Sequence, residues 1–244
     1  MHLTTILTTI VAASGILAAP TSLQLDDRAV VNHDSLNPIR TRLQPGAIGR
    51  AIERFQPLLH IAHGCQPYTT VDDNGNTSGG LQDTGSVDGG CRDPNKGQTY
   101  ARAAWHRGKF AIMYAWYWPK DQPLAGNLAG GHRHDWENVV VWLDNPENAN
   151  PRILGAAASA HGNYQRNTSP PLQGNNVKVE YFTRFPLNHA LQFTNTPGRT
   201  YWISDWDAMP QASRAALTPG GLFGSANVPF RPDSFFSNLD KVFV

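Results

Sequence analysis

The sequence has no excess of charge of either sign, few cysteines and no internal repeat. Its 20 lysines and arginines are balanced by 19 aspartates and glutamates, which gives a formal net charge of +1 and a pI near 7.9. Because a nearly neutral chain has no field strong enough to hold a polyanion, nucleic acid is not an expected partner. No serine or cysteine lies in a recognisable nucleophile motif, which argues against an enzyme that uses such a group.

Long apolar runs are also absent beyond the first 20 residues, MHLTTILTTIVAASGILAAP. Residues 3–19 carry no charge, and small side chains lead to a break after Ala18 or Ala19. This pattern is typical of a secretory signal peptide over residues 1–19. An uncleaved membrane anchor is the less favoured alternative, because a span needs about 20 apolar residues. We therefore expect a secreted, extracellular protein with a mobile segment at 20–40 and a single domain over 41–244.

The two cysteines, Cys65 and Cys91, enclose a loop rich in Gly, Asp, Asn and Thr that cannot bury its own apolar surface. An even pair in a secreted chain predicts a disulfide, which stabilises the fold by about 3–4 kcal/mol in the chain-entropy model. Two buried free thiols are the alternative, and the polar flanks of both cysteines argue against it. The sequons at Asn76 and Asn167 lie in loop-like stretches and are candidate N-glycosylation sites.

Period-2 patterns dominate the rest of the chain. The run KFAIMYAWYWPKD, residues 109–121, is apolar on both faces, so we expect a central strand that stops at Pro119. Further expected strands cover residues 135–143, 152–160, 176–185 and 189–195. Short helices are expected from Ala47, over 211–217 and over 234–243. The fold class that fits is mainly β: an antiparallel β-sandwich with a few peripheral helices.

The stretch GGHRHDWENVVVWL, residues 130–143, places charged and imidazole side chains at the start of an apolar strand. In a strand that begins near His134, Asp135 and Glu137 share a face about 7 Å apart, while His134 and Trp136 face the other way. That spacing suits one cation, bound directly by one carboxylate and through water by the other. Carboxylates, carbonyls and water favour a hard divalent cation, Ca²⁺ or Mg²⁺.

Two more residues extend this candidate metal site. Asp121 follows the aromatic strand, and His132 lies where a loop could turn its ring or its carbonyl towards the same cation. Two alternatives stay open. The charges could simply be solvated, with Arg133 neutralising a carboxylate. His132 and His134 could instead join a carboxylate in a zinc site, although the opposite directions of the strand side chains argue against a shared ligand set.

Residues elsewhere in the chain could complete an open-sided site. His161 and His189 lie at strand ends where such a site could include them, although a core or surface position is the commoner role of a histidine. Aromatic residues in loops, such as Phe185, are candidates for contact with a ligand. The tryptophans of the strands are expected in the core.

Three segments resemble one known family. They are GHRHDWE at 131–137, AIMYAWYWPKD at 111–121, and DWDAMPQASRAAL through FGSANVPF at 205–230. Together they resemble the necrosis- and ethylene-inducing-peptide-like proteins (NLPs), cytolysins of plant-associated microbes, from about Ala47 to the C-terminus. The single cysteine pair resembles the first type of that family. The resemblance implies a secreted β-sandwich similar to actinoporins and fungal lectins.

The resemblance also implies a function at the plant plasma membrane. It implies a divalent-cation site at the rim of the fold that reads the sugar head group of a sphingolipid, glycosylinositol phosphoceramide, through peripheral contact. By motif position, the implied metal ligands are Asp121, His132, Asp135, Glu137 and His161. The candidates for contact with the head group are His189, Phe185 and Arg133.

Three functions compete on these grounds. The favoured one is a metal-dependent, non-enzymatic cytolysin that causes necrosis and defence responses. The second is a secreted metallohydrolase in which His132 or Glu137 activates a metal-bound water. The third is a sugar-binding lectin or passive elicitor that lyses nothing. Vesicle leakage with intact lipid would favour the first, product formation the second, and binding without leakage the third.

Overall fold

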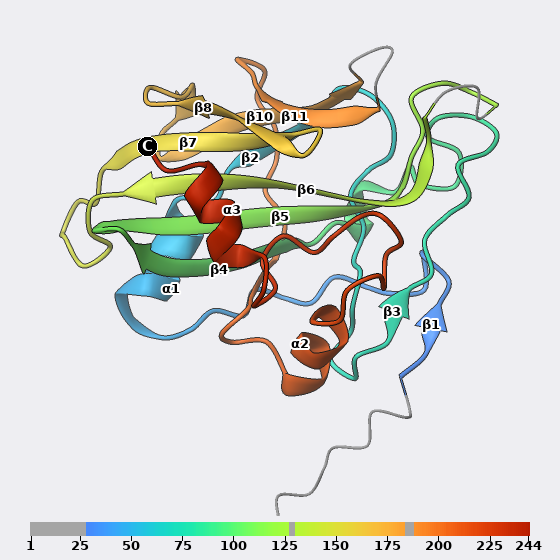
Figure 1. The fold of residues 1–244 in the computed structure, drawn as a ribbon, viewed down its shortest axis with the longest axis horizontal. Helices are drawn as coiled ribbons and strands as arrows, with labels where there is room; N and C mark the ends of the chain where they lie inside the picture. Colours follow the sequence, from blue (N-terminus) through green and yellow to red (C-terminus); the bar gives the residue numbers. More distant parts are fainter. Residues whose placement is uncertain (1–27, 127–129, 184–187) are drawn as a thin grey trace, which may run out of the picture.

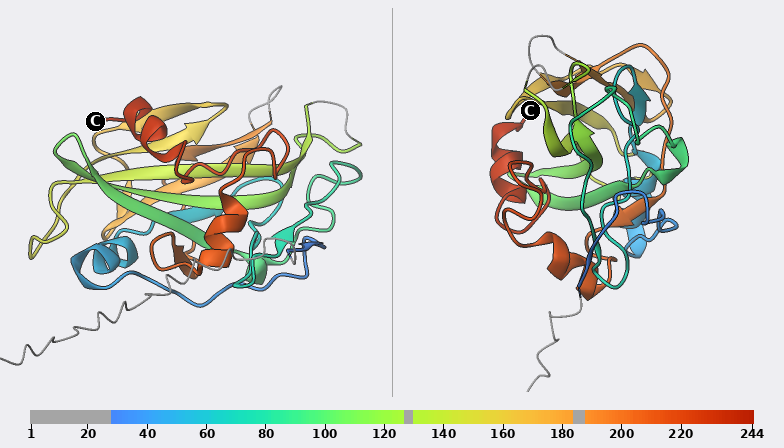
Figure 2. Two further views of the ribbon diagram at one scale, coloured as in Figure 1. Left: turned by 60° about the horizontal axis from the view of Figure 1, so that its bottom comes forward. Right: turned by 90° about the vertical axis from the view of Figure 1, so that its right-hand side faces the viewer.

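Two β-sheets pack face to face in the computed structural model, which describes residues 28–126, 130–183 and 188–244 (Figure 1). The larger sheet has six strands in the order β12–β4–β5–β6–β7–β8. Their bounds are β4 Thr99–His106, β5 Lys109–Asp121, β6 His132–Leu143, β7 Ile153–Ala160, β8 Asn163–Asn167 and β12 Ile203–Asp205. Figure 2 shows the C-terminal helix on one side of this sheet and the smaller sheet on the other.

The smaller sheet has the order β11–β10–β2, with β9 also pairing with β10. The remaining strands are β1 Val30–Val31, β2 Leu58–Ile61, β3 Thr77–Ser78, β9 Leu172–Gln173, β10 Asn176–Thr183 and β11 His189–Phe193. The central ladders from β4 to β8 are antiparallel, as predicted, whereas the pairs β2–β10, β4–β12 and β1–β3 are parallel. The prediction of a mainly β sandwich is confirmed, and its parallel pairs lie at sheet edges.

Aromatic side chains fill the space around β5, where every residue from 110 to 121 is buried. Trp116, Trp118 and Trp142 are among the largest fully buried side chains. Trp118 stacks on Tyr181 of the second sheet, with ring centroids 3.9 Å apart. A strand that is apolar on both faces needs cover on both, which is why β5 takes a central position.

Among the described residues, three short helices lie outside the sheets, as predicted: α1 Gly46–Arg54, α2 Gln211–Leu217 and α3 Phe235–Lys241, with a 3₁₀ turn at Pro94–Lys96. Helix α3 crosses the outer face of the six-stranded sheet in Figure 1. There Trp142 Nε1 donates to the carbonyl of Val242 at 3.0 Å. In the described parts of the chain, no helix is long and apolar enough to cross a membrane.

The prediction that the central strand stops at Pro119 is wrong, because β5 continues to Asp121. Proline cannot donate to a ladder, so it is tolerated in a strand only where no neighbour needs its N–H. Strand β4 pairs with β5 only as far as Tyr100↔Ala115. Beyond that point the neighbour is a loop, and Pro119 accepts a hydrogen bond from the backbone N–H of Leu81 at 2.8 Å.

That loop is the one closed by the predicted disulfide, Cys65–Cys91, which is confirmed. It runs along β5 where β4 ends, and Tyr68 N donates to Tyr117 O at 2.8 Å. The buried Lys120 donates from Nζ to the carbonyl of Ser86 at 2.8 Å. The disulfide loop therefore replaces a strand as the partner of this end of β5.

Part of the segment expected to be mobile packs on the domain. In residues 28–40, β1 pairs with β3 and Leu36 is buried. Residues 1–27, which include the expected signal peptide, lie outside the described residues. Both sequon asparagines make hydrogen bonds: Asn76 Oδ1 accepts from Ala29 N and Asn167 Oδ1 from Ser169 N. Their glycosylation stays a prediction.

Candidate metal centre

The regular alternation of side chains along β6 breaks at His134, whose φ is +64°. This left-handed conformation is uncommon for any residue except glycine. Arg133 and His134 are consecutive, yet both side chains lie against Gly80. A Cβ added there would be 2.7 Å from Arg133 Cγ and 2.6 Å from His134 Cε1. Because neighbours in a regular strand point to opposite faces, the backbone turns over at His134.

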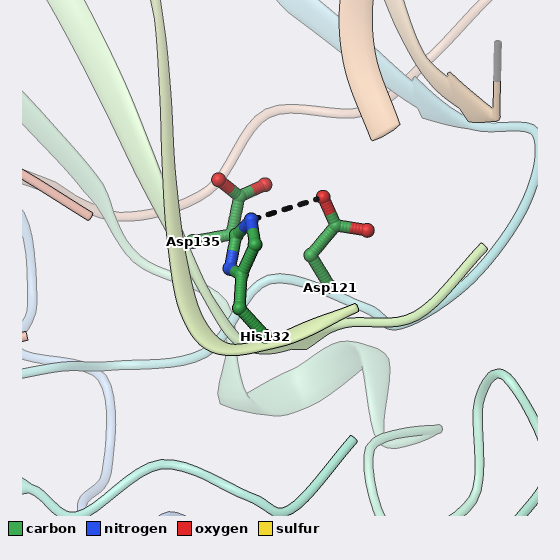
Figure 3. Close-up of side chains that lie close together, drawn as sticks. All are labelled: Asp121, His132 and Asp135. Atoms are coloured by element: carbon green, nitrogen blue, oxygen red, sulfur yellow. Dashed lines mark ion pairs between the residues drawn. The ribbon is translucent and has the colours of Figure 1, made fainter. Parts of the chain in front are cut away.

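This inversion gathers residues that regular strands would separate. Asp121 pairs with His132, and Trp118 pairs with Asp135 in the same register. The two pairs are separated by three residues along each strand, so in a regular ladder the side chains of Asp121 and His132 would lie on the opposite face from that of Asp135. Instead, ligand atoms of Asp121, His132 and Asp135 all lie within 4.8 Å of one another, as Figure 3 shows. The ends of β5 and β6 that carry them bend away from the sheet at the right of Figure 1.

His132 presents its Nε2 to this cluster. Its Nδ1 lies 2.7 Å from the carbonyl oxygen of His134, so the neutral ring carries its proton on Nδ1 and donates it there. Nε2 lies 3.7 Å from Asp121 Oδ2, the contact marked in Figure 3, and accepts from Asn188 Nδ2 at 2.9 Å. A ring oriented by a bond at its other nitrogen is the usual form of a metal-binding histidine.

Asp121 is fully buried and fixed by His189 of β11. The backbone N–H of His189 donates to its two carboxylate oxygens at 3.2 and 3.1 Å, and the ring Nδ1 lies 2.6 Å from Oδ1. The His189 ring stacks on Tyr181, with centroids 4.6 Å apart. The second sheet therefore orients a carboxylate that belongs to the first.

Asp135 and Glu137 point into the same region and are each only 7% exposed. Burial raises the pKa of Asp135 to about 7, and the charge of Asp121 contributes to the rise. Burial also raises the pKa of Glu137 well above its ordinary value, with the charge of Asp135 as the next cause. Tyr181 donates its hydroxyl to Asp135 Oδ2 at 3.0 Å, and Ser159 donates to Glu137 Oε2.

These donors fit a hard divalent cation. In the described residues, the basic side chains within 4 Å of Asp121 are the histidines His132 and His189, and neither Asp135 nor Glu137 pairs with a lysine or arginine. Buried carboxylates so close together repel one another unless a positive charge lies between them. Carboxylate oxygens are the ligands that Ca²⁺ and Mg²⁺ prefer, whereas the imidazole nitrogen of His132 is a ligand that transition metals such as Zn²⁺ prefer.

The alternative zinc site built on two neighbouring histidines does not form. The His134 ring lies on the opposite side of the strand, with Nδ1 2.6 Å from the hydroxyl of Tyr117 and its ring 5.3 Å from that of Phe223. Burial, together with the positive charges of Arg133 and His132, lowers the pKa of His134 to about 4. His134 is thus a neutral, buried side chain outside the cluster.

The other predicted residues fall in different places. His161 lines the same cleft, where Nδ1 donates to Asn188 Oδ1 at 3.0 Å, but it lies outside the three-residue cluster. Its buried Nε2 has no partner among the described residues. Arg133 does not line the cleft, because its guanidinium donates to the carbonyl of Gly79 at 2.7 Å on the other side of β6. Phe185 lies outside the described residues.

Sequence reasoning missed three residues that orient the cluster: Tyr181, Ser159 and Asn188. Tyr181 and Ser159 lie in strands whose pairing in space leaves no trace in local periodicity. Asn188 bridges His132 and His161 through its amide. Its position next to the candidate His189 is the one sequence signal that could have drawn attention to it.

The cluster opens onto a cleft of about 480 Å³. One wall carries His132, Asp135, Glu137 and His189, and the other comes from residues 225–241. Its lining is mostly polar, with amide, hydroxyl, imidazole and charged groups side by side. Such a surface suits a ligand that both donates and accepts hydrogen bonds next to a bound ion.

Known proteins resemble the chain in sequence and in structure. The family model described as necrosis inducing protein (NPP1) matches residues 49–242. NLP effector protein 10 of Phytophthora capsici is 45% identical over 215 residues, which cover 86% of this chain and 90% of that protein.

Solved structures share the fold over most of both chains. Those of NLPPya in complex with mannosamine and with glucosamine are 44% and 43% identical, with TM-scores of 0.82 and 0.81, and each match covers 88% of this chain and 100% of that one. The non-toxic HaNLP3 protein is 39% identical with a TM-score of 0.82, over 86% of this chain and 98% of its own. With the confirmed disulfide and sandwich, these matches show that the chain belongs to the NPP1 family of necrosis-inducing proteins, the NLPs.

Proposed function

We propose that this chain is a secreted, non-enzymatic cytolysin that acts at the plant plasma membrane. Asp121, His132 and Asp135 would hold Ca²⁺ or Mg²⁺, with Glu137 and His161 at the edge of the same site. The bound ion and the cleft would together grip the head group of a sphingolipid, glycosylinositol phosphoceramide. The observation that carries this proposal is the cluster of ligand atoms, within 4.8 Å of one another, of which His132 and Asp135 line an open polar cleft.

The chemistry of the site supports a sugar as the part of the lipid that is recognised. A hard cation on an open rim keeps coordination positions for water, and sugar hydroxyls can replace that water. The polar lining of the cleft suits hydroxyls rather than acyl chains, so the proposed membrane contact is peripheral and at head-group level. The relative that was solved with mannosamine and glucosamine supports a sugar-binding site within this fold.

Dye release from vesicles tests the proposal. Vesicles with and without glycosylinositol phosphoceramide are mixed with the protein, with and without EDTA, and Ca²⁺ or Mg²⁺ is added back. We expect leakage only when the sphingolipid and the ion are both present. Mass spectrometry of the lipid afterwards should find it intact. If cleavage products accumulated in proportion to leakage, the protein would be a metal-dependent hydrolase and the cytolysin proposal would be wrong.

A matched pair of variants makes the test specific. Asp135→Asn keeps the shape of the side chain but removes a charge from the cluster, so it should abolish leakage. Asp207→Asn makes the same chemical change at an exposed residue outside the cleft and should leak like the unmutated chain. If folded Asp135→Asn and Asp207→Asn caused equal leakage, the proposed ion site would be wrong.

A second function has one specific observation in its favour. The HaNLP3 relative is described as non-toxic although its fold matches with a TM-score of 0.82. A non-lytic, sugar-binding elicitor is therefore the alternative for this chain. It predicts ion-dependent binding to sphingolipid vesicles without dye release, and that combination would replace the cytolysin proposal.

A further inference from the structure

A second cleft, of about 600 Å³, lies between the end of α1, the 3₁₀ turn at Pro94–Lys96 and the segment that leads into β12. None of its lining residues belongs to the cleft at the metal cluster. Its most exposed large apolar side chain is Trp202, an indole with 53% of its surface accessible. An aromatic side chain of this size left open in a cleft is a common anchor for ligands.

The backbone around Trp202 is fixed although its side chain is exposed. The carbonyl of Trp202 accepts from Thr99 N at 2.9 Å and from Gln98 Nε2 at 2.6 Å. The next backbone N–H, that of Ile203, donates to the hydroxyl of Thr41 at 3.2 Å. Because the backbone is already ordered, the indole can contact a ligand without a loop becoming ordered first, which lowers the entropy cost of binding.

Tyr201 forms part of the floor of this cleft. It is only 8% exposed, and its hydroxyl is buried without a hydrogen-bond partner in the described part of the chain. Gly97 leaves the space for its ring, because a Cβ at that position would approach within 2.3 Å of two ring carbons. The hydroxyl is therefore closed to a ligand in the cleft, and Tyr201 contributes its ring rather than a hydrogen bond to the site.

Two opposite charges face the cleft without neutralising each other. Glu53 and Arg199 both line it, and neither forms a side-chain hydrogen bond or ion pair among the described residues. The Arg199 guanidinium lies 4.9 Å from the centre of the Tyr201 ring. Glu53 would repel an anion and Arg199 a cation. Hydroxyl groups both donate and accept, so they can satisfy an acceptor and a donor at once.

We propose that this cleft is a second ligand site, which binds an uncharged hexose unit of a glycan. The apolar face of the sugar ring stacks on Trp202, and its hydroxyls bond to Glu53 and Arg199. The site is independent of the metal cluster and of the sphingolipid. A chain with both sites could hold a surface glycan through one and a lipid head group through the other.

Tryptophan fluorescence and calorimetry with defined probes test this site. The probes are methyl β-glucoside, methyl α-mannoside, cellotriose and triacetylchitotriose, all in EDTA so that an ion-dependent site cannot contribute. We expect at least one probe to bind with a Kd of about 1 mM or tighter. If none binds more tightly than about 10 mM, the proposal is wrong, whatever the outcome of the leakage experiment.

Three variants locate the binding. Trp202→Ala should weaken binding by at least about tenfold. Tyr201→Phe removes only a hydroxyl that is closed to the cleft, so it should leave the affinity nearly unchanged. Trp105→Ala removes another half-exposed indole, 50% accessible, which does not line this cleft, and should change nothing. Equal affinities for Trp202→Ala and Trp105→Ala, in variants that melt like the unmutated chain, would overturn the proposal.

Discussion

The two halves of the β5–β6 ribbon differ in what surrounds them. Residues 109–116 and 138–143 form a regular antiparallel ladder that is flanked by β4 on one side and β7 on the other. Residues 117–121 and 132–137 continue the same register beyond the last pair with β4, Tyr100↔Ala115, and beyond the last pair with β7, Val139↔Ala158. Among the described residues, one ribbon therefore passes from the middle of a sheet to a pair of strands without further strand neighbours.

The chemistry changes where the neighbours end. In the flanked half, every side chain of β6 from Val139 to Leu143 is apolar and fully buried. In the other half, the backbone turns over at His134, and three polar side chains meet on one face. A strand inside a sheet must keep its alternation, because each slip would put polar groups in the core. Release from that constraint lets the same two strands build a candidate ion site.

Removal of the disulfide should have its strongest effect on the unflanked half of the ribbon, residues 117–121 and 132–137. The loop that it closes supplies the partners of Pro119 and Lys120 in place of a strand. Cys65→Ser should lower the free energy of unfolding by about 3–4 kcal/mol, because the unfolded chain regains the entropy of that loop. Urea denaturation measures this change, and limited proteolysis should show earlier cleavage within residues 66–90.

The flanked half supplies the control for that experiment. Among the described residues, 138–143 make no hydrogen bond to the disulfide loop, so they should keep their slow amide hydrogen exchange in native conditions after the bond is reduced. Identical melting and identical proteolysis of the oxidised and reduced protein would contradict a structural role for the disulfide.

Loss of one carboxylate should separate ion binding from folding. Asp135→Asn removes a full charge from the cluster, so the affinity for Ca²⁺ or Mg²⁺ should fall by roughly a hundredfold. Calorimetry of both ions measures the affinity. Arg133→Ala is the matched comparison, because its guanidinium donates to Gly79 on the other side of β6 and cannot bind a cation. An unchanged affinity in Asp135→Asn would eliminate the site as described.

The same carboxylate should make the ion-free protein less stable as pH rises. Burial raises the pKa of Asp135 to about 7 from an ordinary value of 3.8, so the folded protein binds more protons than the unfolded chain between these two values. Stability in EDTA should therefore fall as pH increases from about 4 to above 7. Melting temperatures at pH 5 and pH 8 measure this, and Asp135→Asn should reduce the difference. An equal pH dependence in both proteins would contradict the raised pKa.

Local patterns predicted the flanked half well. The alternation in residues 109–121 and the helical spacing after Ala47 gave β5 and α1, because each pattern reports which faces are buried. The extension of β5 past Pro119 was not predictable in this way. It depends on the absence of a neighbouring strand at that point, which is a property of the assembled sheet.

The candidate site was predictable only in part. The sequence indicated Asp121, His132 and Asp135 as candidate metal ligands, and the structure brings them together. Their grouping depends on the inversion at His134, and although histidine adopts a positive φ more often than most residues, that preference is too weak to predict the inversion. The strict alternation used on the sequence would place Asp121 and Asp135 on opposite faces. The supporting Tyr181 and His189 come from the other sheet, at sequence distances that no local pattern spans.

The backbone conformation of His134 can be tested with two substitutions of similar size. Asn tolerates the left-handed region, whereas the β-branched Val does not. His134→Val should lower the free energy of unfolding by about 1–3 kcal/mol and should weaken Ca²⁺ binding several-fold. His134→Asn should keep most of the ion affinity, although it loses the ring contacts to Tyr117 and Phe223. Equal ion affinities in the two folded variants would mean that the inversion does not position the ligands.

A pair of buried tyrosines compares the two halves through single hydroxyl groups. Tyr181 donates to Asp135 Oδ2 at 3.0 Å in the unflanked half, and Tyr114 donates to the carbonyl of Ile52 at 2.8 Å in the flanked half. Both rings are fully buried, so the change to Phe removes one hydrogen bond and little packing in each case. Tyr114→Phe should cost about 1 kcal/mol of stability and leave ion binding unchanged. Tyr181→Phe should weaken Ca²⁺ binding by about tenfold, because the carboxylate loses the donor that orients it. Calorimetry and urea denaturation of both variants decide between these outcomes. If the two variants changed ion affinity equally, the hydrogen bond from Tyr181 would have no special role in positioning Asp135. The two halves would then differ only in which side chains are buried.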